Sequence, residues 1–95
     1  MDERSRIIYK NLGARVQMLR KLKGYTQEEF AEVIDRSASF LSQLESNNAK
    51  DVKGMSMETL FRISEALGST PSKLLEGAEE WGKESEGEGE GGRSI

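Results

Sequence analysis

The segment that decides the fold is residues 25–47, YTQEEFAEVIDRSASFLSQLESN. It contains two short amphipathic stretches, 27–34 and 38–46, with apolar residues at helical spacing in each. The linker between them is three to four residues long, which is the length that a helix-turn-helix unit requires. The segment therefore predicts two short helices, one of which braces the other. A common use of such a pair is to hold one helix in a groove of DNA.

Local signals mark where these helices begin and end. Thr26 followed by Glu29 is a capping box, which predicts a helix start at residue 27. Ser37 is the expected N-cap of the second helix. Asp35 stands in the turn, where its short polar side chain tolerates left-handed backbone better than most residues do. These signals are independent of the hydrophobic pattern and agree with it.

The flanking sequence predicts three more helices and no strands. An apolar stripe through residues 9–22 marks a first helix over 5–23, with Gly24 as its C-terminal cap. A fourth helix begins after Ser56 and ends at Gly68. A short fifth helix begins at Pro71, with Ser69 or Thr70 as its N-cap. The expected fold class is therefore all-α, with five helices around one core.

Composition divides the chain into two parts. Residues 5–77 are long enough for one small domain, whereas residues 78–95, AEEWGKESEGEGEGGRSI, are too polar to offset the entropy lost on ordering. We therefore expect a domain at 5–77 and a disordered acidic tail at 78–95. The chain has a net charge of −3, of which residues 1–77 contribute +1 and the tail −4. A nearly neutral domain is compatible with DNA binding if its basic residues share one face.

Several classes of function are excluded by residue content. The chain has no Cys and no His, so it lacks thiolate and imidazole metal ligands and the commonest general base. No apolar run has membrane-spanning length, and the N-terminus lacks a signal-peptide core. We expect a soluble cytoplasmic protein without a cofactor or metal, and not an enzyme.

The second helix of the pair has the surface that base recognition needs. Leu41 and Leu44 face inward, which leaves small and polar side chains outside: Ala38, Ser39, Ser42 and Gln43. Gln can bond an adenine edge bidentately, Ser can donate or accept, and an Ala methyl can pack on a thymine methyl. Gln27, at the start of the preceding helix, is placed for a phosphate, and Lys50 and Lys53 for the same DNA strand.

These residues resemble the Cro/phage-repressor type of helix-turn-helix regulators over about residues 9–76. TQEEFAEVI is similar to the second helix of that family, SASFLSQLE to the third, and SMETLFRISEALGSTPSKLL to the fourth and fifth. The resemblance implies a compact lambda-repressor-like domain that acts on double-stranded DNA. It also implies a bacterial or phage-encoded homodimer on a palindromic operator, with half-sites about one helical turn apart.

The resemblance also assigns roles residue by residue. It implies base contacts from Ala38, Ser39 and Gln43, with Ser42 near them, and a phosphate contact from Gln27. Apart from the resemblance, we expect further phosphate contacts from Arg36, Asn47, Lys50 and Lys53. It implies an internal ion pair between Arg20 and Glu45 that joins the first helix to the third.

Three departures from the family pattern affect these assignments. Asp35 stands where the family usually has Gly, and Arg36 where it has a small apolar residue. We expect the Arg36 stem to lie over the core with its guanidinium in solvent near DNA. The loop between the third and fourth helices is longer than usual, which puts the exact contacts of Lys50 and Lys53 in question.

Two alternative roles remain open at this point. The first is an antitoxin or a restriction-system controller that also binds a protein partner. The second is an interaction module of the same fold that has lost DNA readout. The acidic tail is either a solubilising end, which we favour, or a competitor of phosphate for the basic face. Trp81 either folds back on the domain, lies in a dimer contact or has no role.

Overall fold

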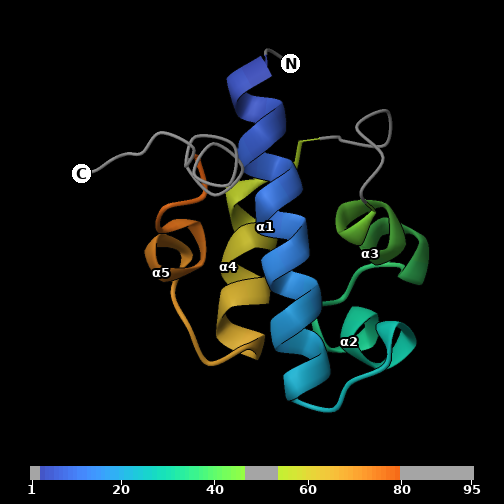
Figure 1. Ribbon diagram of the computed structural model, residues 1–95. Coiled ribbons are helices and arrows are strands. Elements are labelled where there is room, and N and C mark those ends of the chain that lie inside the picture. The colour runs from blue at the N-terminus through green and yellow to red at the C-terminus, as the bar shows by residue number, and fades with distance from the viewer. Residues whose placement is uncertain (1–2, 47–53, 80–95) are drawn as a thin grey trace.

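A computed structural model describes residues 3–46 and 54–79, and within them it has five α-helices (Figure 1). They are α1 (Glu3–Leu22), α2 (Gln27–Val33), α3 (Ala38–Glu45), α4 (Met57–Ala66) and α5 (Pro71–Leu75). Figure 1 shows α1 as the long central helix, with α2 and α3 on one side of it and α4 and α5 on the other. The all-α, five-helix prediction is confirmed. In this part of the chain no helix is both long and apolar enough to cross a membrane.

The helix starts follow the capping residues that the sequence marks. Thr26, Ser37, Ser56 and Thr70 each accept a hydrogen bond from the backbone N–H three residues later. The capping box is complete, because the Glu29 carboxylate also accepts from the Thr26 backbone N–H at 2.9 Å. Such caps each contribute about 1 kcal/mol. They fix where α2 and α3 begin and so which side chains α3 exposes.

The turn between α2 and α3 depends on Asp35. Its φ of 58° is left-handed, as the sequence predicts. The Asp35 N–H donates to the Glu32 carbonyl at 3.1 Å, and the Arg36 N–H donates to the Ala31 carbonyl at 2.9 Å. These two bonds are the Schellman arrangement that ends a helix and reverses the chain. Asp35 therefore takes the place of the glycine that usually occupies this position.

The hydrophobic core lies between α1 and the other four helices. Its members are almost inaccessible to solvent: Leu12, Val16, Phe30, Ile34, Leu41, Leu60, Ile63, Leu67 and Leu74.

The end of α5 and the residue that follows it are tied to α1 by polar contacts. Arg15 Nη1 donates to the carbonyl oxygens of Lys73, Leu74 and Glu76 at 3.1–3.3 Å.

The core extends one residue beyond the predicted boundary. Ala78, which the composition assigns to the tail, is 1% exposed, and its carbonyl accepts from Asn11 Nδ2 at 2.6 Å. Composition cannot reveal this contact, because it joins residues 67 positions apart. Residues 80–95, most of the predicted tail, lie outside the described residues.

Helices α1 and α3 approach each other most closely at Gly13. A Cβ at this position would lie 1.9 Å from the Leu44 carbonyl oxygen, which belongs to the backbone of α3. No side chain fits there without moving one of the two helices. Gly13 therefore sets how closely the C-terminal half of α3 rests on α1.

We expect Gly13→Ala to destabilise the protein by about 1–3 kcal/mol, the usual cost of overpacking a tight contact. Urea denaturation followed by circular dichroism measures this change. Ala14→Ser, at the adjacent exposed position, is the matched control and should change stability little. Equal stability of Gly13→Ala and the wild type would show that α1 and α3 are not in this contact.

Candidate nucleic-acid interface

Helix α3 presents a polar face to solvent. Ser39, Ser42 and Gln43 are exposed and Ala38 is half-buried, whereas Leu41 is fully buried beneath them. Figure 1 shows α3 at one edge of the molecule, beside α1 and α2. The structure therefore brings together the four residues that the sequence predicts for base contact. The Ser and Gln side chains carry donors and acceptors that suit the edge of a base pair, and the Ala38 methyl can make an apolar contact.

The opposite side of α3 is anchored by a buried ion pair. Arg20 Nε lies 2.7 Å from Glu45 Oε2, and Arg20 Nη2 lies 2.9 Å from Oε1. The two side chains are 6% and 1% exposed. Arg20 Nη1 also donates to the Tyr25 carbonyl at 2.7 Å. The pair that the family resemblance implies is therefore present, and it joins α1 and the loop that follows it to the last residue of α3.

The hydrogen bonds to Glu45 hold the pKa of Arg20 above its usual value, against the opposing effect of burial. The guanidinium therefore stays charged throughout the pH range in which proteins are normally folded. A charge in this position is tolerated only with its partner in place, because an unpaired buried charge is strongly destabilising.

Gln27 makes a contact that the sequence does not reveal. Its Nε2 donates to Glu45 Oε1 at 3.0 Å, so the first residue of α2 is bonded to the last residue of α3. Glu45 thus receives hydrogen bonds from Arg20 and from Gln27. The bond orients the Gln27 amide beside α3, and the phosphate contact assigned to Gln27 stays a prediction.

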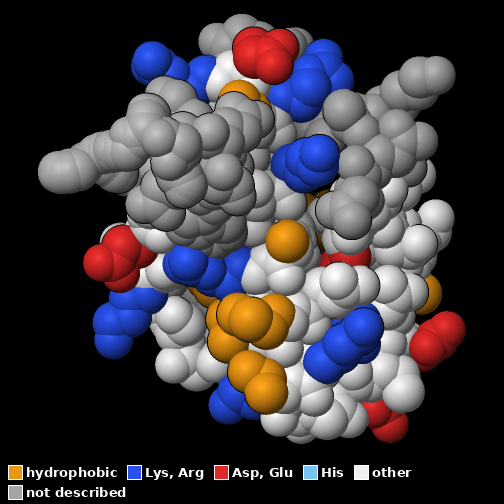
Figure 2. Space-filling view, in the orientation of Figure 1, with side chains coloured by type: hydrophobic (Ala, Val, Ile, Leu, Met, Phe, Trp, Pro, Cys, Tyr) orange, Lys and Arg blue, Asp and Glu red, His pale blue; other side chains and the backbone are white. Residues whose placement is uncertain are grey.

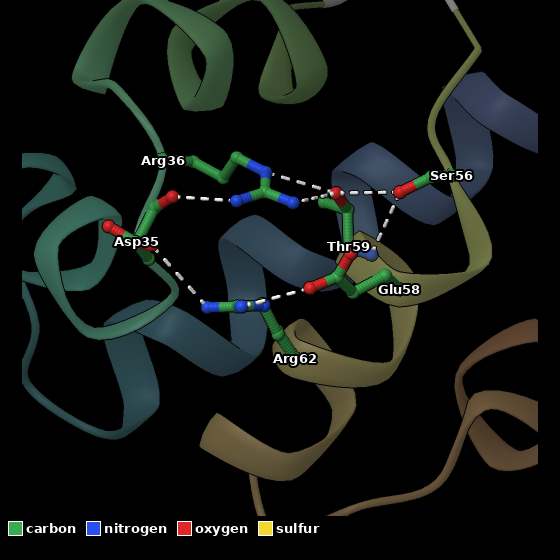
Figure 3. Close-up of polar contacts among 6 residues, drawn as sticks. All are labelled: Asp35, Arg36, Ser56, Glu58, Thr59 and Arg62. Carbon is green, nitrogen blue, oxygen red and sulfur yellow. Dashed lines mark hydrogen bonds and ion pairs between the residues drawn. The ribbon is translucent and has the colours of Figure 1, made fainter.

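Arg36 is half-buried, and its guanidinium is bonded within the domain, whereas the sequence interpretation places it free in solvent. Figure 3 shows it directed toward the start of α4, where Nε and Nη2 donate to Thr59 Oγ1 at 3.0 and 2.8 Å. Its Nη1 donates to the Asp35 carbonyl at 2.7 Å. The sequence interpretation misses this contact because Thr59, a buried hydroxyl, lies 23 residues away.

A second arginine reinforces the same junction. Arg62 Nη2 bonds Glu58 at 2.9 Å and Nη1 lies 3.7 Å from Asp35 Oδ2 (Figure 3). The contact with Arg62 holds the pKa of the exposed Glu58 carboxylate below its usual value. Asp35, Arg36 and Arg62 therefore tie the α2–α3 turn to the first turns of α4. The Glu58–Arg62 pair is an i,i+4 pair within α4 that local spacing can predict, but no local pattern predicts the contacts that Asp35 and Arg36 make with α4.

The electrostatics of α2 limit where phosphate can approach it. Glu28, Glu29 and Glu32 border a shallow hollow whose lining also includes Arg36 and Ala38. The three carboxylates repel the DNA backbone, so a phosphate can approach this hollow only on its Arg36 side. Gln27, whose Nε2 donates to Glu45, lies at the other end of the α2–α3 pair from the Asp35 turn.

Three of the predicted phosphate contacts cannot be placed. Asn47, Lys50 and Lys53 lie outside the described residues. The structure resumes at residue 54, and Tyr9 holds the chain just beyond it. The Tyr9 hydroxyl accepts from the Met55 backbone N–H and donates to the Met55 carbonyl.

The ion pair predicts a specific mutational pattern. Glu45→Ala leaves Arg20 buried without a counter-charge and should cost about 3–5 kcal/mol in the free energy of unfolding. Replacing both residues with Met removes both charges and should cost less than Glu45→Ala alone. Urea denaturation of the single and double variants measures this.

Glu58→Ala, which breaks an exposed ion pair, is the matched control for Glu45→Ala and should have a much smaller effect. An effect of Glu45→Ala no larger than that of Glu58→Ala would contradict a buried, structural role for Arg20–Glu45.

The contact between Arg36 and Thr59 predicts a stability effect of its own. Arg36→Met should lower the free energy of unfolding by about 1–2 kcal/mol, because the Thr59 hydroxyl loses a charged donor. In a Thr59→Val background the same substitution should cost less, and a double-mutant cycle measures the difference. Additive effects of the two substitutions would show that these side chains do not interact.

The chain is similar to known helix-turn-helix proteins. The family model HTH_3, described as "Helix-turn-helix", matches residues 16–74, which is more than half of the chain. The HTH-type transcriptional regulator RamB of Mycobacterium tuberculosis is 35% identical over 57 residues, 60% of this chain and 11% of RamB. The uncharacterized HTH-type transcriptional regulator YazB of Bacillus subtilis is 50% identical over 36 residues, 38% of this chain and 52% of YazB. The chain thus spans only about a tenth of the length of RamB and about half of the length of YazB.

Solved structures extend the similarity over more of the fold. Two crystal structures of the clp gene regulator ClgR from Corynebacterium glutamicum have TM-scores of 0.66 and 0.62, at 30% and 34% identity. They cover 86% and 75% of this chain, and 81% and 87% of the ClgR chains. The matching family consists of transcriptional regulators, which confirms the expectation that the chain is not an enzyme. The chain therefore belongs to the Cro/C1-type helix-turn-helix family of DNA-binding transcriptional regulators.

Proposed function

We propose that the chain is a sequence-specific regulator, acting as a repressor, that reads a palindromic operator by inserting α3 into the major groove. The observation that carries the proposal is the exposed polar face of α3 above a buried ion pair. A face that reads bases must be both accessible and fixed in position. Helix α3 is accessible along Ser39, Ser42 and Gln43 and is fixed through Glu45. The names of RamB, YazB and ClgR, which describe them as regulators, support the same role.

The proposal gives each exposed residue of α3 a separate role. Gln43 bonds an adenine edge, Ser39 and Ser42 bond base or sugar groups, and Ala38 packs against a thymine methyl. Gln27 contacts a phosphate near α3, and Asn47, Lys50, Lys53 and Arg36 complete the set of proposed phosphate contacts. A guanidinium has five N–H groups, and Arg36 uses three of them on Thr59 and Asp35. The proposed phosphate contact of Arg36 therefore uses the other two.

A homodimer follows from the size of the reading surface. One short helix touches only a few base pairs, which is too little to select one site in a genome. Two copies related by a two-fold axis read two half-sites, about 34–36 Å or a multiple of this apart. A dimer bound in this way represses by occupying the promoter and needs no further contact with the transcription machinery.

Selection from a pool of random duplexes, followed by titration at several salt concentrations, tests the proposal. The wild type should select one palindromic sequence and lose affinity steeply as salt rises, because phosphate contacts release counterions. Binding without sequence preference at every salt concentration would contradict the proposal. Either that result or a complete absence of DNA binding would favour an interaction module that has kept the fold.

Two variants separate base reading from phosphate binding. Gln43→Ala should weaken binding to the selected site by about 1–3 kcal/mol and relax the preference at one base pair of each half-site. Gln27→Ala should weaken binding to all duplexes alike. A changed base preference in Gln27→Ala, or an unchanged one in Gln43→Ala, would show that the two roles are assigned wrongly.

A further inference from the structure

Helix α1 has a second apolar stripe, separate from the one that faces the core. Ala14 is exposed, Met18 is 52% exposed and Leu22 is 76% exposed, and these residues follow one another at steps of four. Half-buried Ile7 lies on the same side of the helix, one heptad before Ala14. Figure 2 shows hydrophobic side chains gathered along this face of the molecule, with Lys and Arg around them. An outward helix face is usually polar, so a row of this kind indicates a surface that another segment covers.

The surroundings of this α1 stripe are basic. Apart from Arg20, which is buried and paired with Glu45, helix α1 contains one acidic residue, Glu3, and five basic ones, Arg4, Arg6, Lys10, Arg15 and Lys21. Lys10 and Lys21 are exposed on one flank, and Arg15 lies on the other, where it holds the end of α5. Two copies of this face would repel each other. An acidic segment with an apolar anchor suits it better than a second copy does.

The C-terminal end of the described chain lies against this stripe. Asn11, between Ile7 and Ala14 on the same side of α1, donates to the Ala78 carbonyl at 2.6 Å. Residues 80–95 follow directly and contain five Glu, two basic residues and the one Trp of the chain, Trp81. Three extended residues span about 10 Å, and Ala14 and Met18 lie only about 5 and 11 Å along the helix axis from Asn11. Trp81 is therefore within reach of both.

From this placement we infer that residues 80–95 bind the α1 stripe, with the Trp81 indole over Ala14 and Met18 and the glutamates beside Lys10 and Lys21. The indole supplies apolar area to cover the stripe, and the carboxylates match its basic flanks. The stripe lies on the opposite side of α1 from Gly13 and Arg20, which contact α3. Bound in this way, the acidic residues are held away from α3. The inference does not depend on the proposed function, and its test uses no DNA.

The fluorescence of Trp81 in the full chain tests the inference directly, because no other Trp contributes. The emission of the full chain should lie at shorter wavelength than that of a synthetic peptide of residues 78–95. The double variant Ala14→Glu/Met18→Gln should shift the emission to that of the peptide while circular dichroism shows an unchanged helical fold. Met57→Gln, at an exposed methionine on α4, is the matched control and should leave the emission unchanged.

Three results would overturn the inference. Wild-type emission equal to that of the peptide would show that Trp81 is not covered. A blue shift of the Trp81 emission that disappears on dilution would show that the stripe is covered by a second copy of the chain. An equal loss of the shift in Met57→Gln would place the indole elsewhere. A shift that is independent of concentration and sensitive only to the Ala14/Met18 substitutions would support the inference.

Discussion

The buried pair of Arg20 and Glu45 is the interaction on which the arrangement of the helices depends. It joins α1 to α3, and through Gln27 and the Tyr25 carbonyl it also holds the start of α2. Two charges removed from water are stable together only if their remaining donors and acceptors are also bonded. Here the same carboxylate accepts from two side chains and the same guanidinium donates to a carboxylate and a carbonyl. The position of α3 thus rests on several bonds that converge on Glu45 and Arg20.

Two further contacts fix α3 and the turn before it. Gly13 lets α1 approach the α3 backbone more closely than any side chain permits, and Arg36 ties the turn to Thr59 on α4. Helices of seven and eight residues are not stable alone in water, so α2 and α3 owe their rigidity to these tertiary contacts. Rigidity matters for the proposed function, because short side chains such as serine reach a base edge only if the helix that holds them is well placed.

Features that depend on neighbours in the sequence could be predicted, and features that depend on distant residues could not. The caps at Thr26 and Ser37 and the left-handed Asp35 follow from side chains a few residues apart, and the structure has all of them. The family resemblance supplies Arg20–Glu45 but not the bond from Gln27 to the same carboxylate. The contacts of Arg36 with Thr59 and of Asn11 with Ala78 join positions 23 and 67 residues apart, for which a single sequence carries no signal.

In the proposed function, the exposed face of α3, held by the Arg20–Glu45 pair, reads the base sequence of DNA. Nuclear magnetic resonance titration of the full chain with two duplexes, one with the selected site and one of scrambled sequence, tests this claim. The amides of Ser39, Ser42 and Gln43 should shift differently with the two duplexes, whereas those on the outer side of α1 should respond alike to both. Identical shifts of α3 with both duplexes, or sequence-dependent shifts confined to other helices, would contradict the claim.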